Sequence, residues 1–384
     1  MAEKIGIVAV AKTTYKEARP DVDFVELAFE SIEKLLTETG LSYTDDGTGI
    51  DAAITCSQDH DDGKTISGMV VCDVIGGHLR SEEKIAGDGT AALCYAAMQI
   101  LSGHFDTMLV LAHAKESQSE RKLIENAGLD PIFLQMLGID FLSSAAMQAK
   151  GYMHESGITP QQCAQVVMKN RRNAKSNPYS QCSGELTMAE VLNSTMLSDP
   201  IRLLDSKPIS DGSCALILAT EEKAKRFTDK PVWLKGFGLC YDSHYLGYRN
   251  LTDCDSLEQA SRQAYKMAGI TEPGREIDVA EISEYYSYQE LLWSERLGLC
   301  KRGEGGKFVD NGNTQIGGKL PINPSGGLLS GVPVNVAGLD RIAEATLQLK
   351  GEARERQVSG AKIALAHGTT GACGQFHCVV VLER

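Results

Sequence analysis

Residues 84–117, KIAGDGTAALCYAAMQILSGHFDTMLVLAHAKES, decide the fold that we expect for this chain. The segment predicts a short strand, a glycine turn at residues 87–89, a helix at residues 90–101 and a buried strand at residues 107–111. Ala, Leu, Met and Gln are good helix formers, and Gly103 is typical of a helix end. The turn exposes unpaired N–H groups and the positive end of the helix dipole, which suits an activated thiolate or an oxyanion.

The composition indicates a cytoplasmic protein with a large core. The chain has 384 residues, of which 42% are hydrophobic, and a formal net charge of −13, which argues against a general affinity for nucleic acid or an anionic membrane. Its 11 Cys residues form no CxxC pair, so we expect free thiols in a reducing compartment. The start, MAEKIGIVAVAKT, predicts a strand and not a signal peptide, and no apolar run has the length of a membrane span.

The alternation of strands and helices occurs twice, which predicts a duplicated α/β unit. KLLTETGLSYTDDGTGIDAAI resembles YKMAGITEPGREIDVAEI, and Ala112-His113 matches Ala366-His367. We place the halves at residues 1–230 and 231–384, with a loop excursion at about 116–200. Two such halves predict a five-layered α-β-α-β-α core. The predicted strands are residues 4–10, 50–55, 107–111, 212–220, 232–236, 277–282 and 361–366. The predicted helices are residues 23–39, 65–75, 90–101, 143–156, 159–173, 256–269, 288–297 and 337–350.

Several segments spread over the chain resemble the thiolase superfamily, in the branch related to sterol-carrier-protein thiolases. They include DPIRLLD at residues 199–205, PISDG at 208–212, GEGGK at 303–307 and IGGKLPIN at 316–323. The resemblance implies the thiolase fold, a homodimer, and a coenzyme A thioester as substrate with no tightly bound cofactor. It also implies a small zinc-ribbon/OB-fold partner of the DUF35 type.

The four family motifs that carry the chemistry are altered here. The nucleophile motif reads Ala86-Gly87-Asp88-Gly89, with alanine where the family has its cysteine. The motif that supplies a water-holding residue reads Ser283-Glu284-Tyr285-Tyr286, and the Gly-His-Pro motif reads Gly331-Val332-Pro333. The loop of the second catalytic cysteine reads His367-Gly368-Thr369-Thr370-Gly371. Because such groups act together, ordinary Cys-dependent thiolysis is disfavoured.

The polar residues that remain at these motifs are the candidate catalytic residues, and each also has a structural explanation. Asp88 is most simply a helix N-cap, whose pKa would be lowered. Tyr285 and Tyr286 are able to fill the core, and His367 is able to serve as a buried structural histidine. The candidate catalytic residues are His367, Glu284, Tyr285, Asp88 and Ser283. The candidate coenzyme A contacts are Arg171, Arg172, Lys175, Gly326 and Gly327.

Two other features are weaker candidates, and we predict no metal site. Cys94, inside the central helix, is expected to pack as a small hydrophobic residue. Residues 59–62, Asp-His-Asp-Asp, have no EF-hand spacing, so a solvated turn is expected.

Three functions stay open. The first is an acyl-CoA-binding subunit of a multicomponent system that makes or breaks a C–C bond. The second is a nucleophile-free retro-aldolase or retro-Claisen enzyme that uses Glu284, Tyr285 and His367. The third is an ordinary acyl-CoA acyltransferase whose nucleophile has moved to another Cys. A covalent acyl-cysteine would support the third alone.

Overall fold

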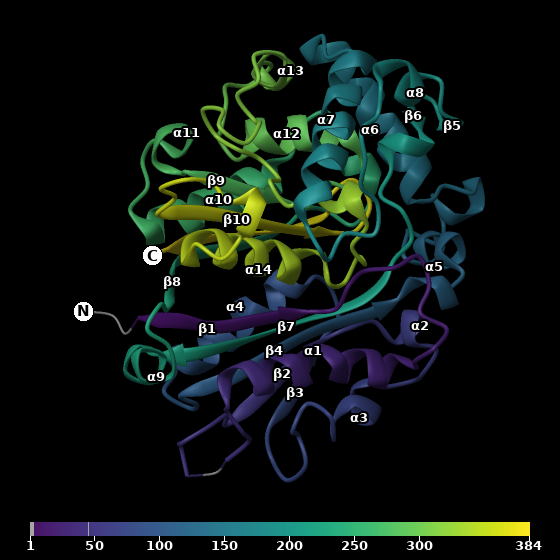
Figure 1. Cartoon of the computed structure of the whole chain (residues 1–384). Helices are drawn as coiled ribbons and strands as arrows, with labels where there is room; N and C mark the ends of the chain where they lie inside the picture. The colour runs from purple at the N-terminus through teal and green to yellow at the C-terminus, as the bar shows by residue number, and fades with distance from the viewer. Residues whose placement is uncertain (1–3, 45) are drawn as a thin grey trace.

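A computed structural model describes residues 4–44 and 46–384 as one α/β body (Figure 1). Figure 1 shows the two halves of the sheet stacked one above the other, with helices between them and outside them. The strands are β1 Ile5–Lys12, β2 Ala52–Cys56, β3 Glu82–Ile85, β4 Thr107–Lys115, β5 Met196–Ser198, β6 Ile201–Arg202, β7 Asp211–Thr220, β8 Val232–Tyr241, β9 Val279–Ile282, β10 Ile363–Thr370 and β11 Phe376–Glu383. The helices are α1 Phe24–Thr39, α2 Asp59–Asp62, α3 Gly68–Val71, α4 Gly89–Leu101, α5 Arg121–Ala127, α6 Phe141–Ser156, α7 Pro160–Asn173, α8 Met188–Leu192, α9 Glu221–Phe227, α10 Asp255–Ala268, α11 Pro273–Glu276, α12 Ser287–Arg296, α13 Gly305–Asp310 and α14 Ala337–Lys350.

The strand order repeats between the two halves of the chain. The main sheet has the order β3-β2-β4-β7-β1-β8-β11-β10-β9. From β1, the next strands are antiparallel β7, antiparallel β4 and parallel β2. From β8, they are antiparallel β11, antiparallel β10 and parallel β9. This matching order supports the internal duplication inferred from the sequence, and it makes β4 and β10 equivalent strands.

Helices α4 and α14 lie between the two halves of the sheet, and this gives the α-β-α-β-α layers (Figure 1). The inner faces of both halves pack on these helices in one hydrophobic cluster. Helix α1 covers the outer face of the first half, and α10 and α12 cover that of the second. The predicted layers are therefore present, with one refinement. The halves are not separate sheets, because β1 and β8 pair at Gly6 with Trp233 and at Ile7 with Val232.

The local sequence explains the helix boundaries close to the site. Helix α1 starts at a capping box of Asp23 and Glu26 and ends at Gly40, which has a φ of 67°. Asp88 caps α4, which starts one residue before the predicted helix. The prediction of α14 at residues 337–350 is confirmed.

Other predictions of local structure are wrong. The helix expected at residues 65–75 is reduced to the single turn α3, and residues 59–62 form helix α2 and not a solvated turn. In α2 the Asp61 side chain is buried. Strands β5, β6 and β11 and helices α9 and α13 were not predicted. The domain division between residues 230 and 231 stays a prediction.

Candidate active site

The turn before α4 is closed by the buried carboxylate of Asp88. It accepts hydrogen bonds from the backbone N–H of Thr90 and of Gly338, both at 2.9 Å, and from the Thr90 hydroxyl. A Cβ atom on Gly368 would lie 2.0 Å from Asp88 Oδ1, so glycine is needed there. Asp88 is thus the predicted N-cap. The prediction that its pKa is lowered is wrong, because burial outweighs these hydrogen bonds and raises the pKa to about 6.

A thiol lies at this turn, although not at residue 86, where we predict the position of the family's cysteine. Ala86 is exposed at the end of β3. Cys56 Sγ, at the end of β2, lies 3.6 Å from the carbonyl oxygens of Gly87 and of Asn335. The Cys56 side chain is fully buried, and burial raises its pKa well above 9, with the charge of Asp88 acting in the same direction. Cys56 is therefore a neutral thiol at neutral pH and a poor nucleophile.

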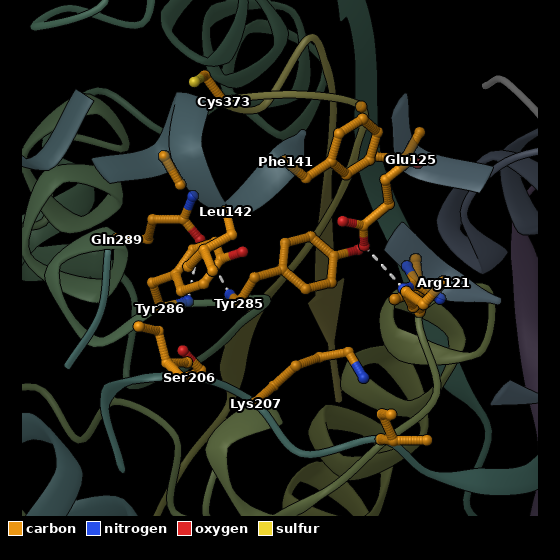
Figure 2. A pocket seen from close by; sticks show the side chains of 16 residues that line it. Arg121, Glu125, Phe141, Leu142, Ser206, Lys207, Tyr285, Tyr286, Gln289 and Cys373 are labelled. Atoms are coloured by element: carbon orange, nitrogen blue, oxygen red, sulfur yellow. Dashed lines mark hydrogen bonds and ion pairs between the residues drawn. The ribbon is translucent and has the colours of Figure 1, made fainter. Parts of the chain in front are cut away.

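Two adjoining cavities, of about 290 Å³ and about 450 Å³, lie at the end of β10. We call them the aromatic cavity and the α5 cavity. The aromatic cavity is bordered by Phe141, Tyr285, Tyr286 and aliphatic side chains (Figure 2). The α5 cavity lies along Leu123, Ile124 and Ala127. Six residues line both cavities: Arg121, Glu125, Phe141, Val334, Thr370 and Gly371.

Tyr285 is the predicted catalytic residue that reaches a cavity. Its hydroxyl donates to the carbonyl oxygen of Thr369 at 2.8 Å, and its backbone N–H donates to Gln289 at 2.9 Å. Burial raises the pKa of Tyr285 well above 10, and the charge of Asp88 adds to the shift. Figure 2 shows the ring crossing the aromatic cavity with its hydroxyl toward Glu125 and Arg121. Tyr285 is therefore a protonated phenol on the cavity wall.

Four charged side chains form a network, and three of them, Arg121, Glu125 and Lys207, line the aromatic cavity. Glu116, fully buried, accepts from Arg121 Nη1 at 2.9 Å and from Lys207 Nζ at 2.8 Å. Glu125 accepts from Arg121 Nε at 2.8 Å. Burial alone would raise the pKa of Glu116, but Lys207 and Arg121 together lower it below 4.5. Burial raises the pKa of Glu125 and lowers that of Lys207. None of these four residues was predicted from the sequence.

Glu284 lies outside both cavities, in a second polar cluster. Its carboxylate accepts from the side-chain amides of Asn170 and Asn323, both at 2.9 Å. The same two amides donate to Glu290, and burial followed by the charge of Glu290 raises the pKa of Glu284 to about 8. A Cβ atom on Gly327 would lie 1.9 Å from Glu284 Oε1. Gly326 and Gly327 are buried within this cluster, away from both cavities, and their contact with coenzyme A stays a prediction.

His367 lies on the face of β10 opposite Asp88. Its Nε2 is 2.8 Å from Nδ1 of His377, and His377 Nε2 is 3.0 Å from Cys254 Sγ. The Trp293 ring packs edge-on against both imidazoles. Burial lowers the pKa of His367 to about 3. His367 lines neither cavity, so this geometry matches the structural explanation of the residue.

The remaining predicted residues also lie apart from the cavities. Ser283 is buried, and its hydroxyl has no hydrogen-bond partner among the described residues. Arg172 donates to Gln315 at 3.3 Å, and Lys175 pairs with Glu185 at 3.1 Å. Arg171 lies beside them at the end of α7. Their role with coenzyme A stays a prediction, as does the catalytic role of Ser283.

Cys373 is a cysteine on the wall of the aromatic cavity. It lies in the loop after β10, has a φ of 54°, and lines the aromatic cavity. Arg249 holds this loop by donating to the carbonyl oxygens of Ala372, Cys373 and Gly374. Burial raises the pKa of Cys373 to about 11, so its thiol is able to donate a proton but is not ionised at neutral pH.

The described residues contain neither a metal-binding cluster nor a membrane-spanning helix. Within residues 4–44 and 46–384, no group of three or more His, Cys, Asp or Glu side chains is arranged to hold a metal ion. In the same residues, no helix is long and apolar enough to cross a membrane.

Comparisons with known proteins agree with this fold. A model of the family described as thiolase C-terminal domain-like matches residues 239–384. Acetyl-CoA acetyltransferase of Methanothermobacter thermautotrophicus is 35% identical over 373 residues, which are 92% of this chain and 96% of the relative. Human sterol carrier protein 2 is 31% identical over 402 residues, 95% of this chain and 69% of the relative. A solved structure described as Ltp2-ChsH2(DUF35) aldolase has a TM-score of 0.84 at 25% identity and covers 99% of this chain and 97% of its own.

The chain therefore belongs to the thiolase superfamily. The predicted family and the predicted fold class are both confirmed.

Proposed function

We propose that this chain is the thiolase-fold subunit of a multicomponent system that breaks or forms a C–C bond in an acyl-CoA by aldol chemistry, without a covalent acyl-enzyme. One observation carries the proposal. The aromatic cavity is lined by a carboxylate, a phenol and two cations. The thiol of Cys373 on its wall and that of Cys56 at the turn before α4 both have raised pKa values. Ala86 stands at the family position of the attacking sulfur. These groups suit proton transfer and not thioester exchange.

The cleavage direction needs one base, one acid and no nucleophile. Glu125 accepts the hydroxyl proton of a 3-hydroxyacyl-CoA, and the electrons of that O–H bond form the carbonyl of the released aldehyde or ketone. The bond between Cα and Cβ breaks, and its electron pair forms the thioester enolate. Tyr285 then protonates Cα and yields the shortened acyl-CoA. Glu125 suits the role of base because burial moves its pKa upward, toward neutral pH. Tyr285 suits the role of acid because it stays protonated.

The two cavities suit the two fragments of such a substrate. They adjoin at the pair of Arg121 and Glu125, so a scissile bond placed there has one fragment on either side. The aromatic cavity has mostly apolar side chains, which favour an apolar acyl or carbonyl fragment.

We also propose a small DUF35-type partner and a homodimer. Support for the partner comes from the aldolase structure, whose name pairs Ltp2 with a DUF35 chain and which covers 99% of this chain. Affinity purification of the tagged protein from its native host, followed by mass spectrometry, tests both. A chain that elutes alone as a monomer would contradict them.

The alternative with a relocated cysteine has one specific candidate, because Cys373 lines the aromatic cavity. Incubation with labelled acyl-CoA and measurement of the intact mass separates the two functions. We expect no acyl adduct on the wild-type protein and no loss of turnover in Cys373→Ser. An acyl group on Cys373 or Cys56 would establish covalent chemistry and refute our proposal.

Turnover of 3-hydroxyacyl-CoA by the native complex is the direct test. We expect Glu125→Gln and Tyr285→Phe each to lower kcat by about 100-fold or more, as loss of a general acid or base does. Tyr248→Phe is the matched control, because Tyr248 is 82% exposed. Turnover that survives in both Glu125→Gln and Tyr285→Phe, or that is lost only in Glu284→Gln, would remove the roles proposed here.

A further inference from the structure

Glu116 is positioned to hold two cations and not to react. Its Oε1 accepts from Arg121 and from the backbone N–H of Val334 at 2.8 Å, and its Oε2 accepts from Lys207 and from the N–H of Ser210 at 3.0 Å. Four donors fill the lone pairs of one carboxylate, which leaves none for a substrate proton. Glu116 is therefore a positioning residue for Lys207 and Arg121.

The two cations keep unused donors beside the cavities. An ammonium group has three N–H donors, and Lys207 uses two, toward Glu116 and toward the carbonyl oxygen of Pro208 at 2.9 Å. Arg121 uses Nη1 and Nε, while its Nη2 makes no hydrogen bond to the described residues. Both side chains line the aromatic cavity (Figure 2).

Among Glu116, Arg121, Glu125 and Lys207, the charges balance only when Glu125 is ionised. The carboxyl of Asp61 also acts on Arg121, but burial raises the pKa of Asp61 and favours its neutral form. Arg121 and Lys207 contribute two positive charges, and Glu116 contributes one negative charge. Burial favours the neutral form of Glu125. When Glu125 is protonated, one positive charge on these mostly buried side chains is left unmatched. Such a charge binds an anion far more strongly than an exposed lysine does.

We propose that Lys207 and Arg121 form a binding site for a negatively charged oxygen of the acyl-CoA. That oxygen belongs either to the enolate formed on C–C cleavage or to a carboxylate carried by the acyl chain. The inference rests on the proposed function for the enolate, whereas recognition of a carboxylate is measurable without turnover.

The test measures binding and Cα exchange in Lys207→Met. Dissociation constants are measured for succinyl-CoA, which carries a carboxylate, and for butyryl-CoA, which does not. Exchange of the Cα hydrogen of butyryl-CoA in D₂O reports the enolate. Lys225→Met is the control, because Lys225 is exposed on α9 and pairs with Glu221. Lys207→Arg keeps the charge and is expected to restore most of any loss.

Two results support the site. If the carboxylate is the ligand, the dissociation constant of succinyl-CoA rises about tenfold or more while that of butyryl-CoA stays within twofold. If the enolate is the ligand, both constants stay within twofold while the exchange rate falls about tenfold or more.

Two results overturn it. Equal weakening of both ligands means that the anion belongs to coenzyme A itself or that the cations only hold the wall. If neither the dissociation constants nor the exchange rate changes, no anion of the ligand contacts Lys207. If Lys207→Met does not fold, the same measurements are made on Arg121→Gln, because this variant leaves Lys207 paired with Glu116. Failure of the proposed function is detected separately: the wild-type complex would then show no turnover of 3-hydroxyacyl-CoA.

Discussion

Replacement of Glu116 by glutamine tests whether the charged network holds the cavity wall. The carboxylate accepts four hydrogen bonds at 2.8–3.0 Å, two of them from cations. Glutamine removes the negative charge and places an NH₂ group opposite a donor. Removal of one partner from a buried ion pair costs about 3–5 kcal/mol, because the remaining charge stays buried. We expect Glu116→Gln to lower the free energy of unfolding by that amount.

Urea unfolding followed by tryptophan fluorescence measures the change, since Trp293 is buried in the second half of the sheet. The matched control is Glu221→Gln, which makes the same chemical change in an exposed pair with Lys225. We expect the control to cost less than about 1 kcal/mol. A loss below about 1 kcal/mol in Glu116→Gln would show that the network contributes little to stability, and would refute the reasoning.

The same variant has a pH signature. The folded pKa of Glu116 is lowered, so its contribution to stability is present above the unfolded value, near pH 4.3, and is lost as the pH falls through the folded value. The difference between wild type and Glu116→Gln is therefore expected to be equal at pH 7.0 and pH 5.5 and to shrink below about pH 4. A difference that grows on acidification would contradict the assignment.

Three further predictions concern other buried groups. The pKa of Asp88 is raised to about 6, so ionisation of Asp88 destabilises the wild-type protein as the pH rises from about 4 to about 6. Relative to wild type, the free energy of unfolding of Asp88→Asn should therefore increase by about 3 kcal/mol over that pH range, as measured by urea unfolding. Gly368→Ala places a Cβ 2.0 Å from Asp88 Oδ1 and should lower Tm by several degrees or prevent folding, whereas Gly128→Ala, with its nearest contact at 3.4 Å, should not. Because the pKa of His367 is lowered to about 3, wild type should lose up to about 1.4 kcal/mol of unfolding free energy per pH unit, relative to His367→Asn, as the pH falls below about 6.5. The kcat of His367→Asn for 3-hydroxyacyl-CoA should stay within threefold of the wild-type value.

The fold was predictable where its signal is local. Helix α14 has a helical apolar period and a closing glycine, Gly351, and its predicted bounds are confirmed. Strand β11 was missed although it lies between β8 and β10, because its place depends on pairing with residues that are distant in sequence. Helix α9 was missed for a related reason. Its seven residues are mostly charged, and tertiary packing of Ala224 on β1 and β7 holds it.

The candidate site was predictable only in part. Asp88 and Tyr285 were selected as candidates from the sequence because they adjoin the ends of elements with strong local patterns. Arg121, Glu125 and Lys207 were missed, because the first two lie in the irregular excursion and the third lies more than 80 residues later in a loop. One signal was available. Glu116 directly follows the buried strand β4, and the carboxyl ends of strands are where ligand sites gather in α/β folds.

The surroundings of the cavity disfavour a thiolate. Cys56 and Cys373 both lie where burial favours the neutral thiol, and Asp88 contributes a repulsive charge at Cys56. Among the residues that the structure describes, no histidine lines the aromatic cavity to accept a thiol proton. The charges of Arg121 and Lys207 are matched by Glu116 and Glu125 together, so they stabilise a new anion only when Glu125 is neutral. That condition is met when Glu125 has taken a proton from substrate, which is the moment at which the enolate forms.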